Sequence, residues 1–183
     1  DRETSGILLV AKKRSALKHL QDQFRERETG KTYLALVQGS WPEKLKVIDS
    51  ALHKFLLPDG ERRVKVTSNE DPDGMRSITL VKVAERLVDC TLLEVTIKTG
   101  RTHQIRVHLA SQGHPIAGDD KYGDFEWNKV LQKQGLKRMF LHAWRLQFSH
   151  PATGKRVELK SNLPSELQLY VNHAKPKSTS PPV

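Results

Sequence analysis

The pattern of apolar and polar positions predicts a strand, a helix and a second strand at the start of the chain. Residues 7–11 form a short apolar run, which is typical of a β-strand. Over 15–27, apolar residues recur at helical spacing behind Ser15, a residue type that often caps a helix N-terminus. Over 31–39 the residues alternate as in a strand, and we expect apolar side chains on both of its faces.

The middle of the chain is predicted to be rich in strands. Pro-Asp-Gly at 58–60 separates two β-like segments, which predicts a hairpin. Residues 68–74 are polar and rich in turn formers, so we expect a loop there. The segments 77–87 and 90–100 carry branched, apolar residues and predict two neighbouring strands.

The apolar period changes to that of a helix after Gly100. A helix is predicted there, with Thr102 as its N-cap and Gly113 as its C-terminal stop. A short helix, two strands and a last helix are predicted farther along the chain, over 125–135, 139–151, 155–161 and 164–174. This interleaving predicts an α+β fold with a mixed, largely antiparallel central sheet and flanking helices.

Length and composition indicate one globular domain over 1–174. A chain of 183 residues has an ordinary domain size, and residues 175–183 are rich in proline, serine and lysine, so we expect a flexible tail. No apolar run approaches the roughly 20 residues of a membrane span, so no membrane partner is expected. Cys90 is the only cysteine, which excludes an internal disulfide and is compatible with a cytoplasmic location.

The charge of the chain points to a polyanionic partner. Lysine and arginine number 31 against 21 aspartate and glutamate residues, which gives a formal net charge of +10. Such a balance favours binding to nucleic acid. A basic surface that serves only solubility is the alternative, because charge reports on partners and not on fold.

Other kinds of site find little support in the sequence. Asp119 and Asp120 are adjacent in a turn-rich segment and are interpreted as turn formers, not as the acid pair of a glycosidase. His103 and His108 are five residues apart, which does not place both on one helix face, so no metal site is expected. No glycine-rich phosphate loop is present, so no nucleotide cofactor is expected. Histidines near turns and strand ends are interpreted as structural: His114, His142 and His150.

A more specific pattern joins three segments, DRETSG (1–6), KTYLALVQG (31–39) and GRTHQIRVHLASQGHPIAGDDKYG (100–123). In order and spacing they resemble the pseudouridine synthases of the RluA family, and the resemblance extends over nearly the whole chain. The C-type branch, which acts on large-subunit ribosomal RNA, is the most similar in three stretches, 12–17, 33–37 and 119–124. The resemblance implies the pseudouridine synthase fold, a catalytic domain that is incomplete at its N-terminus, and an S4-type RNA-binding domain upstream.

The resemblance also implies catalytic residues. Asp1 corresponds to the nucleophile of the family, which attacks the sugar or helps to eliminate the base. Arg106 corresponds to the arginine that pairs with this aspartate and favours its charged form. Tyr33 corresponds to the tyrosine that stacks on the flipped uracil, and it is also a candidate for removal of the C5 proton. Interpreted locally, the same residues are a turn aspartate, a solvated arginine and a half-buried strand tyrosine.

Contacts to RNA are implied for residues around the entrance of the predicted helix. Arg101, His103 and Gln104 lie where an arginine and exposed amide groups hold phosphate, and Ile105 is expected to line the pocket. Thr4 belongs to the motif around Asp1, and we expect it to hold that loop in shape beside the RNA.

The resulting hypothesis is an enzyme that isomerises specific uridines of large-subunit (23S) ribosomal RNA to pseudouridine, without a metal, an organic cofactor or another small-molecule cofactor. Its basic surface would offset the cost of taking a base out of the stack. Two alternatives stay open: a non-catalytic RNA-binding module of the same fold, and a glycosidase-like nucleotide hydrolase. The oligomeric state is open, with a monomer as the default expectation.

Overall fold

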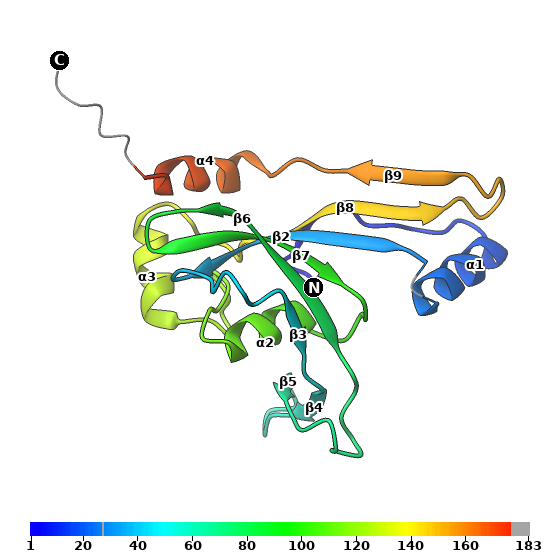
Figure 1. Ribbon diagram of the computed structural model, residues 1–183, viewed down its shortest axis with the longest axis horizontal. Coiled ribbons are helices and arrows are strands. Elements are labelled where there is room, and N and C mark those ends of the chain that lie inside the picture. The colour runs from blue at the N-terminus through cyan, green and yellow to red at the C-terminus, as the bar shows by residue number, and fades with distance from the viewer. Residues whose placement is uncertain (27, 177–183) are drawn as a thin grey trace.

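A mixed sheet forms the centre of the computed structural model, which describes residues 1–26 and 28–176. Its strands within these residues are β1 (Ser5–Gly6), β2 (Gly30–Gln38), β3 (Val47–Asp49), β6 (Ile78–Arg86), β7 (Cys90–Ile97), β8 (Leu141–Ser149) and β9 (Arg156–Lys160). The strand order is β1-β8-β2-β7-β6-β3, and β9 also pairs with β8 (Figure 1). β1 is parallel to β8, whereas the other paired strands are antiparallel. The predicted α+β class with a largely antiparallel sheet is therefore confirmed.

Helices cover both faces of this sheet. They are α1 (Arg14–Arg25), α2 (Gln104–Ser111), α3 (Phe125–Lys133) and α4 (Ser165–Ala174). On one face, Ile105 and Leu109 of α2 pack into a buried apolar cluster, and on the other face Leu131 of α3 and Leu167 of α4 pack into a second one. α1 contacts β8 near the end of the sheet (Figure 1). The four helices thus bury their apolar sides as the predicted periods require.

The alternation of β2 connects the two cores. Leu34 and Leu36 belong to the cluster under α3 and α4, whereas Ala35 and Val37 belong to the cluster under α2. Successive side chains of a strand point to opposite faces, so a strand buried on both sides has few polar residues. The prediction of apolar side chains on both faces of this strand is confirmed.

A small hairpin stands apart from the main sheet (Figure 1). It consists of β4 (Leu52–Leu56) and β5 (Arg62–Val66), which pair antiparallel and confirm the hairpin predicted around 58–60. Leu52 and Val64 pack with Val107 of α2 in a separate buried cluster. The hairpin is therefore fixed against the helix that carries the third motif.

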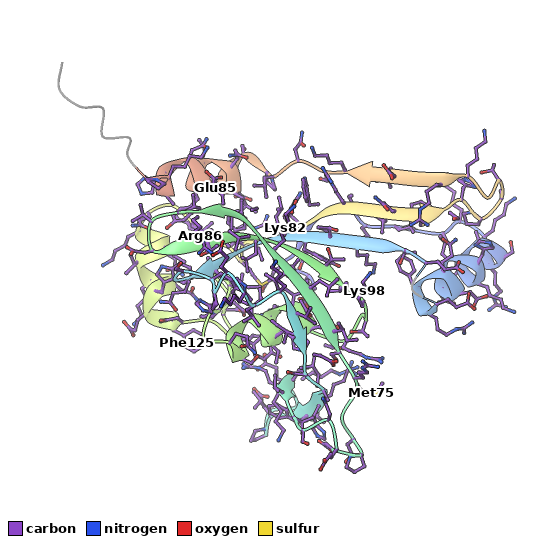
Figure 2. The ribbon with its side chains drawn as sticks, in the orientation of Figure 1. Met75, Lys82, Glu85, Arg86, Lys98 and Phe125 are labelled. Carbon is purple, nitrogen blue, oxygen red and sulfur yellow. The ribbon has the colours of Figure 1, made fainter. Side chains whose placement is uncertain are left out.

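Strand β6, which lies between β7 and β3, shows how polar residues reach the surface. Val81 is buried and Lys82 is exposed, and Figure 2 labels Lys82, Glu85 and Arg86 along this strand. The Arg86 side chain donates a hydrogen bond of 3.0 Å to the carbonyl of Trp41. One end of β6 is thus tied to the segment that follows β2.

The prediction of a strand over 7–11 is wrong. β1 ends at Gly6, and the next residue, Ile7, donates one hydrogen bond of 3.1 Å to Ala143 without extending the ladder. Ile7 packs with the apolar cluster beside α1, whereas Leu8 is 85% exposed. A short apolar run is typical of a strand, but one side of this run packs against a helix instead of pairing with another strand.

Both predicted N-caps are also wrong. The N-cap of α1 is Lys13, so Ser15 lies inside the first turn. The N-cap of α2 is His103, not Thr102, and its backbone is left-handed with φ 52°. Gly113 does end the second helix, because its positive φ of 82° stops the helical path.

The end of the last helix, α4, agrees with the predicted boundary at Ala174. Residues 177–183 of the predicted tail lie outside the described residues, so the flexible tail stays a prediction. Within residues 1–26 and 28–176, none of the helices has both the length and the apolar character that crossing a membrane requires.

Candidate active site

The loop that carries Asp1 is held close to β8 by a glycine. The amide of Thr4 donates to the carbonyl of Asp1 at 3.2 Å, which closes a turn ahead of β1. Gly6 pairs with Ala143 and has a φ of +106°. A Cβ at Gly6 would lie 2.2 Å from the carbonyl oxygen of Ala143. Only glycine therefore allows β1 to approach β8 this closely.

Side chains from β8 and from the loop before it anchor the same loop. Ser5 Oγ lies 2.8 Å from Nδ1 of the buried His142, and the other ring nitrogen of His142 lies 2.7 Å from the carbonyl of Ser161. Arg138 donates to Ser5 Oγ at 2.9 Å and to the carbonyl of Glu3 at 3.3 Å. The position of Asp1 is thus set by the packing of β8 and its neighbours.

The carboxylate of Asp1 faces the start of α2. Its Oδ1 lies 3.2 Å from Nε2 of His103, and its Oδ2 lies 3.6 Å from Nη1 of Arg106. The Asp1 side chain is 20% exposed, whereas that of Arg106 is 3% exposed. The structure therefore places the predicted nucleophile and its predicted arginine in contact, at the edge between buried and open space.

Arg106 has a second and closer acidic partner, Asp119. Its Nε and Nη2 donate to the two Asp119 oxygens at 2.9 and 2.6 Å, and both residues are buried. Burial by itself raises the pKa of Asp119, but the hydrogen bond from Arg106 and those from the amides of Lys121 and Tyr122 outweigh it and lower that pKa. Burial likewise lowers the pKa of Arg106, and the bond to Asp119 reverses this. Both groups are charged.

His103 connects Asp1 to Tyr122. Its Nδ1 lies 2.6 Å from the Tyr122 hydroxyl, opposite the nitrogen that faces Asp1. Burial, and then the positive charges of Arg106 and Lys121, lower the pKa of His103 to about 4. The ring is therefore neutral at pH 7, and its 3.2 Å contact with Asp1 is a contact of a neutral imidazole and not an ion pair.

Tyr33 reaches the site from the middle of the sheet. The register between β2 and β8 shifts between Thr32 and Tyr33, an irregularity that changes the direction in which a side chain points. Burial raises the pKa of the Tyr33 phenol, so its hydroxyl keeps its proton at neutral pH. A protonated hydroxyl is compatible with stacking of the Tyr33 ring on uracil. It makes Tyr33 less suited to act alone as the base.

One cavity of about 340 Å³ brings the predicted site residues together. Its lining includes each of them: Asp1, Thr4, Tyr33, Arg101, His103, Gln104, Ile105 and Arg106. A neighbouring cavity of about 500 Å³ shares part of this lining, namely Asp1, Thr4, Lys31 and Tyr33. The two form adjacent parts of one open depression, of the size that small-ligand sites have.

Gln104 supports the loop before α2. Its side-chain oxygen accepts hydrogen bonds from Thr99 Oγ1 at 2.7 Å and from the Arg101 amide at 3.0 Å. Its side-chain nitrogen donates to the Ile78 carbonyl at 2.9 Å and to Thr79 Oγ1 at 3.0 Å. The amide is occupied within the protein, and a direct contact of Gln104 with RNA stays a prediction.

Sequence reasoning missed two residues of this site. Asp119 is a turn former, as predicted, because its side chain accepts hydrogen bonds from the amides of Lys121 and Tyr122. It also accepts a hydrogen bond from Arg106, which the sequence did not predict. Tyr122 contacts His103 and also lies beneath the Arg106 guanidinium, 5.2 Å from the ring centroid. The third motif contains both residues, but turn propensity explains an Asp-Asp pair equally well.

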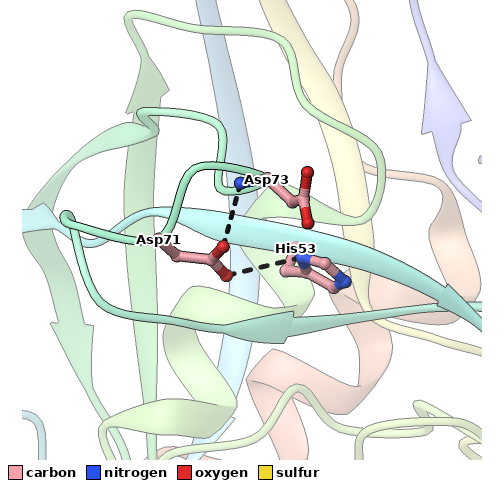
Figure 3. Close-up of side chains that lie close together, drawn as sticks. All are labelled: His53, Asp71 and Asp73. Atoms are coloured by element: carbon pink, nitrogen blue, oxygen red, sulfur yellow. Dashed lines mark hydrogen bonds and ion pairs between the residues drawn. The ribbon is translucent and has the colours of Figure 1, made fainter.

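A separate group of potential metal ligands lies beside the small hairpin. His53, Asp71 and Asp73 each offer one ligand atom within 4.8 Å of the others (Figure 3). The Asp71 carboxylate already accepts hydrogen bonds from Thr67 Oγ1 at 2.7 Å and from the Asp73 amide at 2.9 Å. Asp73 is exposed. The group is explained by the turn that it stabilises.

Comparison with known sequences decides the family. Residues 1–111 match the profile described as RNA pseudouridylate synthase. The chain belongs to the RNA pseudouridylate synthase family. The family expected from the three motifs, DRETSG, KTYLALVQG and GRTHQIRVHLASQGHPIAGDDKYG, is thereby confirmed.

Curated members of the pseudouridylate synthase family resemble the chain over most of its length. Ribosomal large subunit pseudouridine synthase C of Haemophilus influenzae is 46% identical over 168 residues, which are 92% of this chain and 51% of that protein. The protein of the same name in Escherichia coli is 48% identical over 170 residues, which are 92% of this chain and 52% of that protein. The chain thus spans about half the length of the curated relatives it matches.

Solved structures of pseudouridylate synthases share the fold. Human RNA pseudouridylate synthase domain containing 1 has a TM-score of 0.74 and 30% identity, over 90% of this chain and 66% of that chain. Human RNA pseudouridylate synthase domain containing 4 has a TM-score of 0.68 and 24% identity, over 88% of this chain and 68% of that chain, and shows the fold alone. The predicted pseudouridine synthase fold is confirmed.

Proposed function

We propose that this protein isomerises specific uridines of large-subunit ribosomal RNA to pseudouridine, with Asp1 as the nucleophile. The observation that carries the proposal is the position of the Asp1 carboxylate, which lies 3.2 Å from His103 and 3.6 Å from Arg106 in a cavity that Tyr33 also lines. Family membership and the names of the curated relatives support the choice of reaction and of RNA.

The reaction changes connectivity without changing mass. The bond from N1 of uracil to C1′ of ribose breaks, the base turns, and a bond from C5 to C1′ forms. C5 loses its proton and N1 takes up a proton, so the atoms balance. The Asp1 carboxylate attacks C1′ or assists departure of the base, which divides one difficult step into easier ones. The Arg106 guanidinium faces that carboxylate at 3.6 Å and, being held by Asp119, keeps its direction.

Tyr33 and the basic surface serve the flipped base. A uridine must leave the stack before its glycosidic bond can be reached, which costs about a few kcal/mol. The Tyr33 ring provides a face on which uracil stacks, and phosphate contacts from a chain of net charge +10 contribute the binding free energy. Arg101, which also lines the cavity, is the site residue best suited to a phosphate.

An isomerisation assay tests this function. Wild-type protein and Asp1→Asn are incubated with a 23S ribosomal RNA transcript under single-turnover conditions, and pseudouridine is mapped chemically. We expect pseudouridine with the wild type, none with Asp1→Asn, and equal RNA affinity for the two, since an amide cannot replace the nucleophile. Pseudouridine formed by a verified Asp1→Asn protein would refute the mechanism.

The same assay separates the two alternatives. A non-catalytic RNA-binding module binds the transcript and leaves every uridine unchanged, and a nucleotide hydrolase leaves abasic sites instead of an isomer of the same mass. Mapping in ribosomal RNA from cells with and without the gene identifies the uridines chosen. We also propose a cytoplasmic monomer that needs no metal or organic cofactor, and an S4-type RNA-binding domain upstream in the full-length protein.

A further inference from the structure

Tyr122 lies between the small hairpin and the candidate nucleophile. Its hydroxyl oxygen is 3.1 Å from the backbone nitrogen of Val64 in β5 and 2.6 Å from Nδ1 of His103. The other ring nitrogen of His103, Nε2, is 3.2 Å from Oδ1 of Asp1. These contacts form a continuous path of hydrogen-bonding groups from the hairpin to the carboxylate.

The chemistry of the groups fixes the direction of the first hydrogen bond in this path. A backbone amide can only donate, so the Tyr122 oxygen accepts from Val64. Among the described residues, Nδ1 of His103 is the acceptor within reach of the Tyr122 hydroxyl proton. A neutral imidazole that accepts at Nδ1 carries its proton on Nε2, the nitrogen that lies 3.2 Å from Oδ1 of Asp1.

The surroundings hold both rings in place. The Tyr122 ring lies 5.2 Å from the Arg106 guanidinium carbon and 5.7 Å from that of Arg63, and it meets the His103 ring edge-on at a centroid distance of 5.3 Å. His103 itself has a left-handed backbone with φ 52°. Such a conformation in a non-glycine residue costs free energy and is often found at functional sites. Here it directs the imidazole toward Asp1.

We propose that His103 and Tyr122 are positioning residues for the Asp1 carboxylate. The Tyr122 hydroxyl selects the tautomer of His103 that is protonated on Nε2, and that proton holds Oδ1 of Asp1 while Arg106 faces Oδ2. Neither residue has to touch the uridine for this role. The inference rests on the proposed function of Asp1.

Tyr122→Phe tests the role, because it keeps the ring between the two guanidinium groups and removes only the hydroxyl. Without the hydroxyl, part of the His103 population takes the other tautomer and turns a lone pair toward the carboxylate. We expect the single-turnover rate of isomerisation to fall about tenfold or more, as for other residues that orient a reacting group, while RNA affinity is unchanged. Tyr170→Phe is the matched control, since its hydroxyl bonds Gln134 at 2.9 Å away from the site.

A second substitution shows whether Tyr122 acts through His103. His103→Gln places an amide nitrogen near the position of Nε2, and an amide donates to Asp1 without any choice of tautomer. We expect Tyr122→Phe to change the rate less than about twofold in the His103→Gln background, because coupled residues give non-additive effects. An equal loss in both backgrounds, or no loss in Tyr122→Phe, would overturn the proposal.

The tautomer can also be measured without catalysis. Nitrogen-15 NMR shifts of the histidine rings distinguish Nδ1 from Nε2 protonation, and His103→Gln identifies the signal of His103. We expect Nε2 protonation in the wild type and a mixture in Tyr122→Phe, and Nδ1 protonation in the wild type would contradict the inference. If the wild type made no pseudouridine although the tautomer was as stated, the proposed function would fail and the catalytic part of the inference with it.

Discussion

The Arg106 guanidinium is bound from two sides, and its strongest partner is Asp119. Two of its nitrogens donate to Asp119 at 2.9 and 2.6 Å, which leaves Nη1 to face Asp1 at 3.6 Å. A two-pronged bond of this kind fixes the plane of a guanidinium as well as its position. The arginine is therefore aligned for Asp1 before any RNA binds.

Loss of the Asp119 charge should destabilise the fold. Asp119→Asn leaves the 3% exposed Arg106 without its main counter-charge, and breaking a buried pair costs about 3 to 5 kcal/mol. Asp120→Asn is the control, because that side chain is 65% exposed and lies 3.8 Å from Arg106, and we expect about 1 kcal/mol or less. Urea unfolding measures both. An equal loss of unfolding free energy in the two variants would show that the buried Arg106–Asp119 pair stabilises the fold no more than the exposed contact with Asp120 does.

The hydroxyl of Tyr33 can be separated from its ring. Tyr33→Phe keeps the stacking face, so RNA affinity should be retained, and a strongly reduced single-turnover rate would indicate a chemical role for the hydroxyl. Tyr33→Ala removes the face as well and should weaken both affinity and rate. Affinity is measured by filter binding of the transcript. A Tyr33→Phe protein with the wild-type rate would limit the residue to stacking.

Gly6 should be irreplaceable at the contact between β1 and β8. Gly6→Ala adds a methyl group 2.2 Å from a backbone oxygen and also strains a positive φ, so we expect a loss of more than about 1 kcal/mol and a displaced Asp1. Gly135→Ala is the control, because Gly135 has a φ of +95° and open space where the Cβ would lie. Its loss of stability therefore reports the cost of the backbone angle alone. Urea unfolding and the isomerisation assay are applied to both. An equal cost for the two variants would mean that β1 can move away without consequence.

Stability should fall as the pH is lowered from 7 to 5. Burial, followed by the charges of Arg106 and Lys121, lowers the pKa of His103 to about 4, whereas an unfolded histidine has a pKa of about 6.5. Between these values the unfolded chain binds a proton that the folded chain does not, so folding loses up to about 1.4 kcal/mol per pH unit. Burial lowers the pKa of His108 too and acts in the same direction.

His103→Gln provides the control for this pH dependence. It removes one of the two titrating groups, and the loss of unfolding free energy between pH 7 and 5 should become smaller. Asp119 does not contribute in this range, because its lowered pKa keeps the carboxylate charged. Identical slopes for the wild type and His103→Gln would show that His103 titrates normally in the folded protein.

Local patterns were reliable where one element buries its own apolar side. The alternation over 31–39 correctly predicted a strand with two buried faces, and Pro-Asp-Gly at 58–60 correctly predicted the hairpin. The run 7–11 is apolar as well but packs against α1, since an apolar run indicates which side chains are buried and not what covers them. The N-cap of α2 was predicted wrongly for a related reason. The tertiary contacts of His103 outweigh the capping preference of Thr102, and His103 takes the N-cap position.

The sequence by itself determined most of the elements, the family and the members of the three motifs, since these depend on residue type, order and spacing. Only the tertiary structure decided which charges meet. Asp119 is a turn former in the sequence and a buried partner of Arg106 in the fold, 13 residues apart along the chain and 2.6 Å apart in space. Tyr122 likewise reaches His103 from the loop before α3, and Val64 of β5 reaches Tyr122. A buried charge requires a partner, but its identity follows from how the elements pack, which no local pattern records.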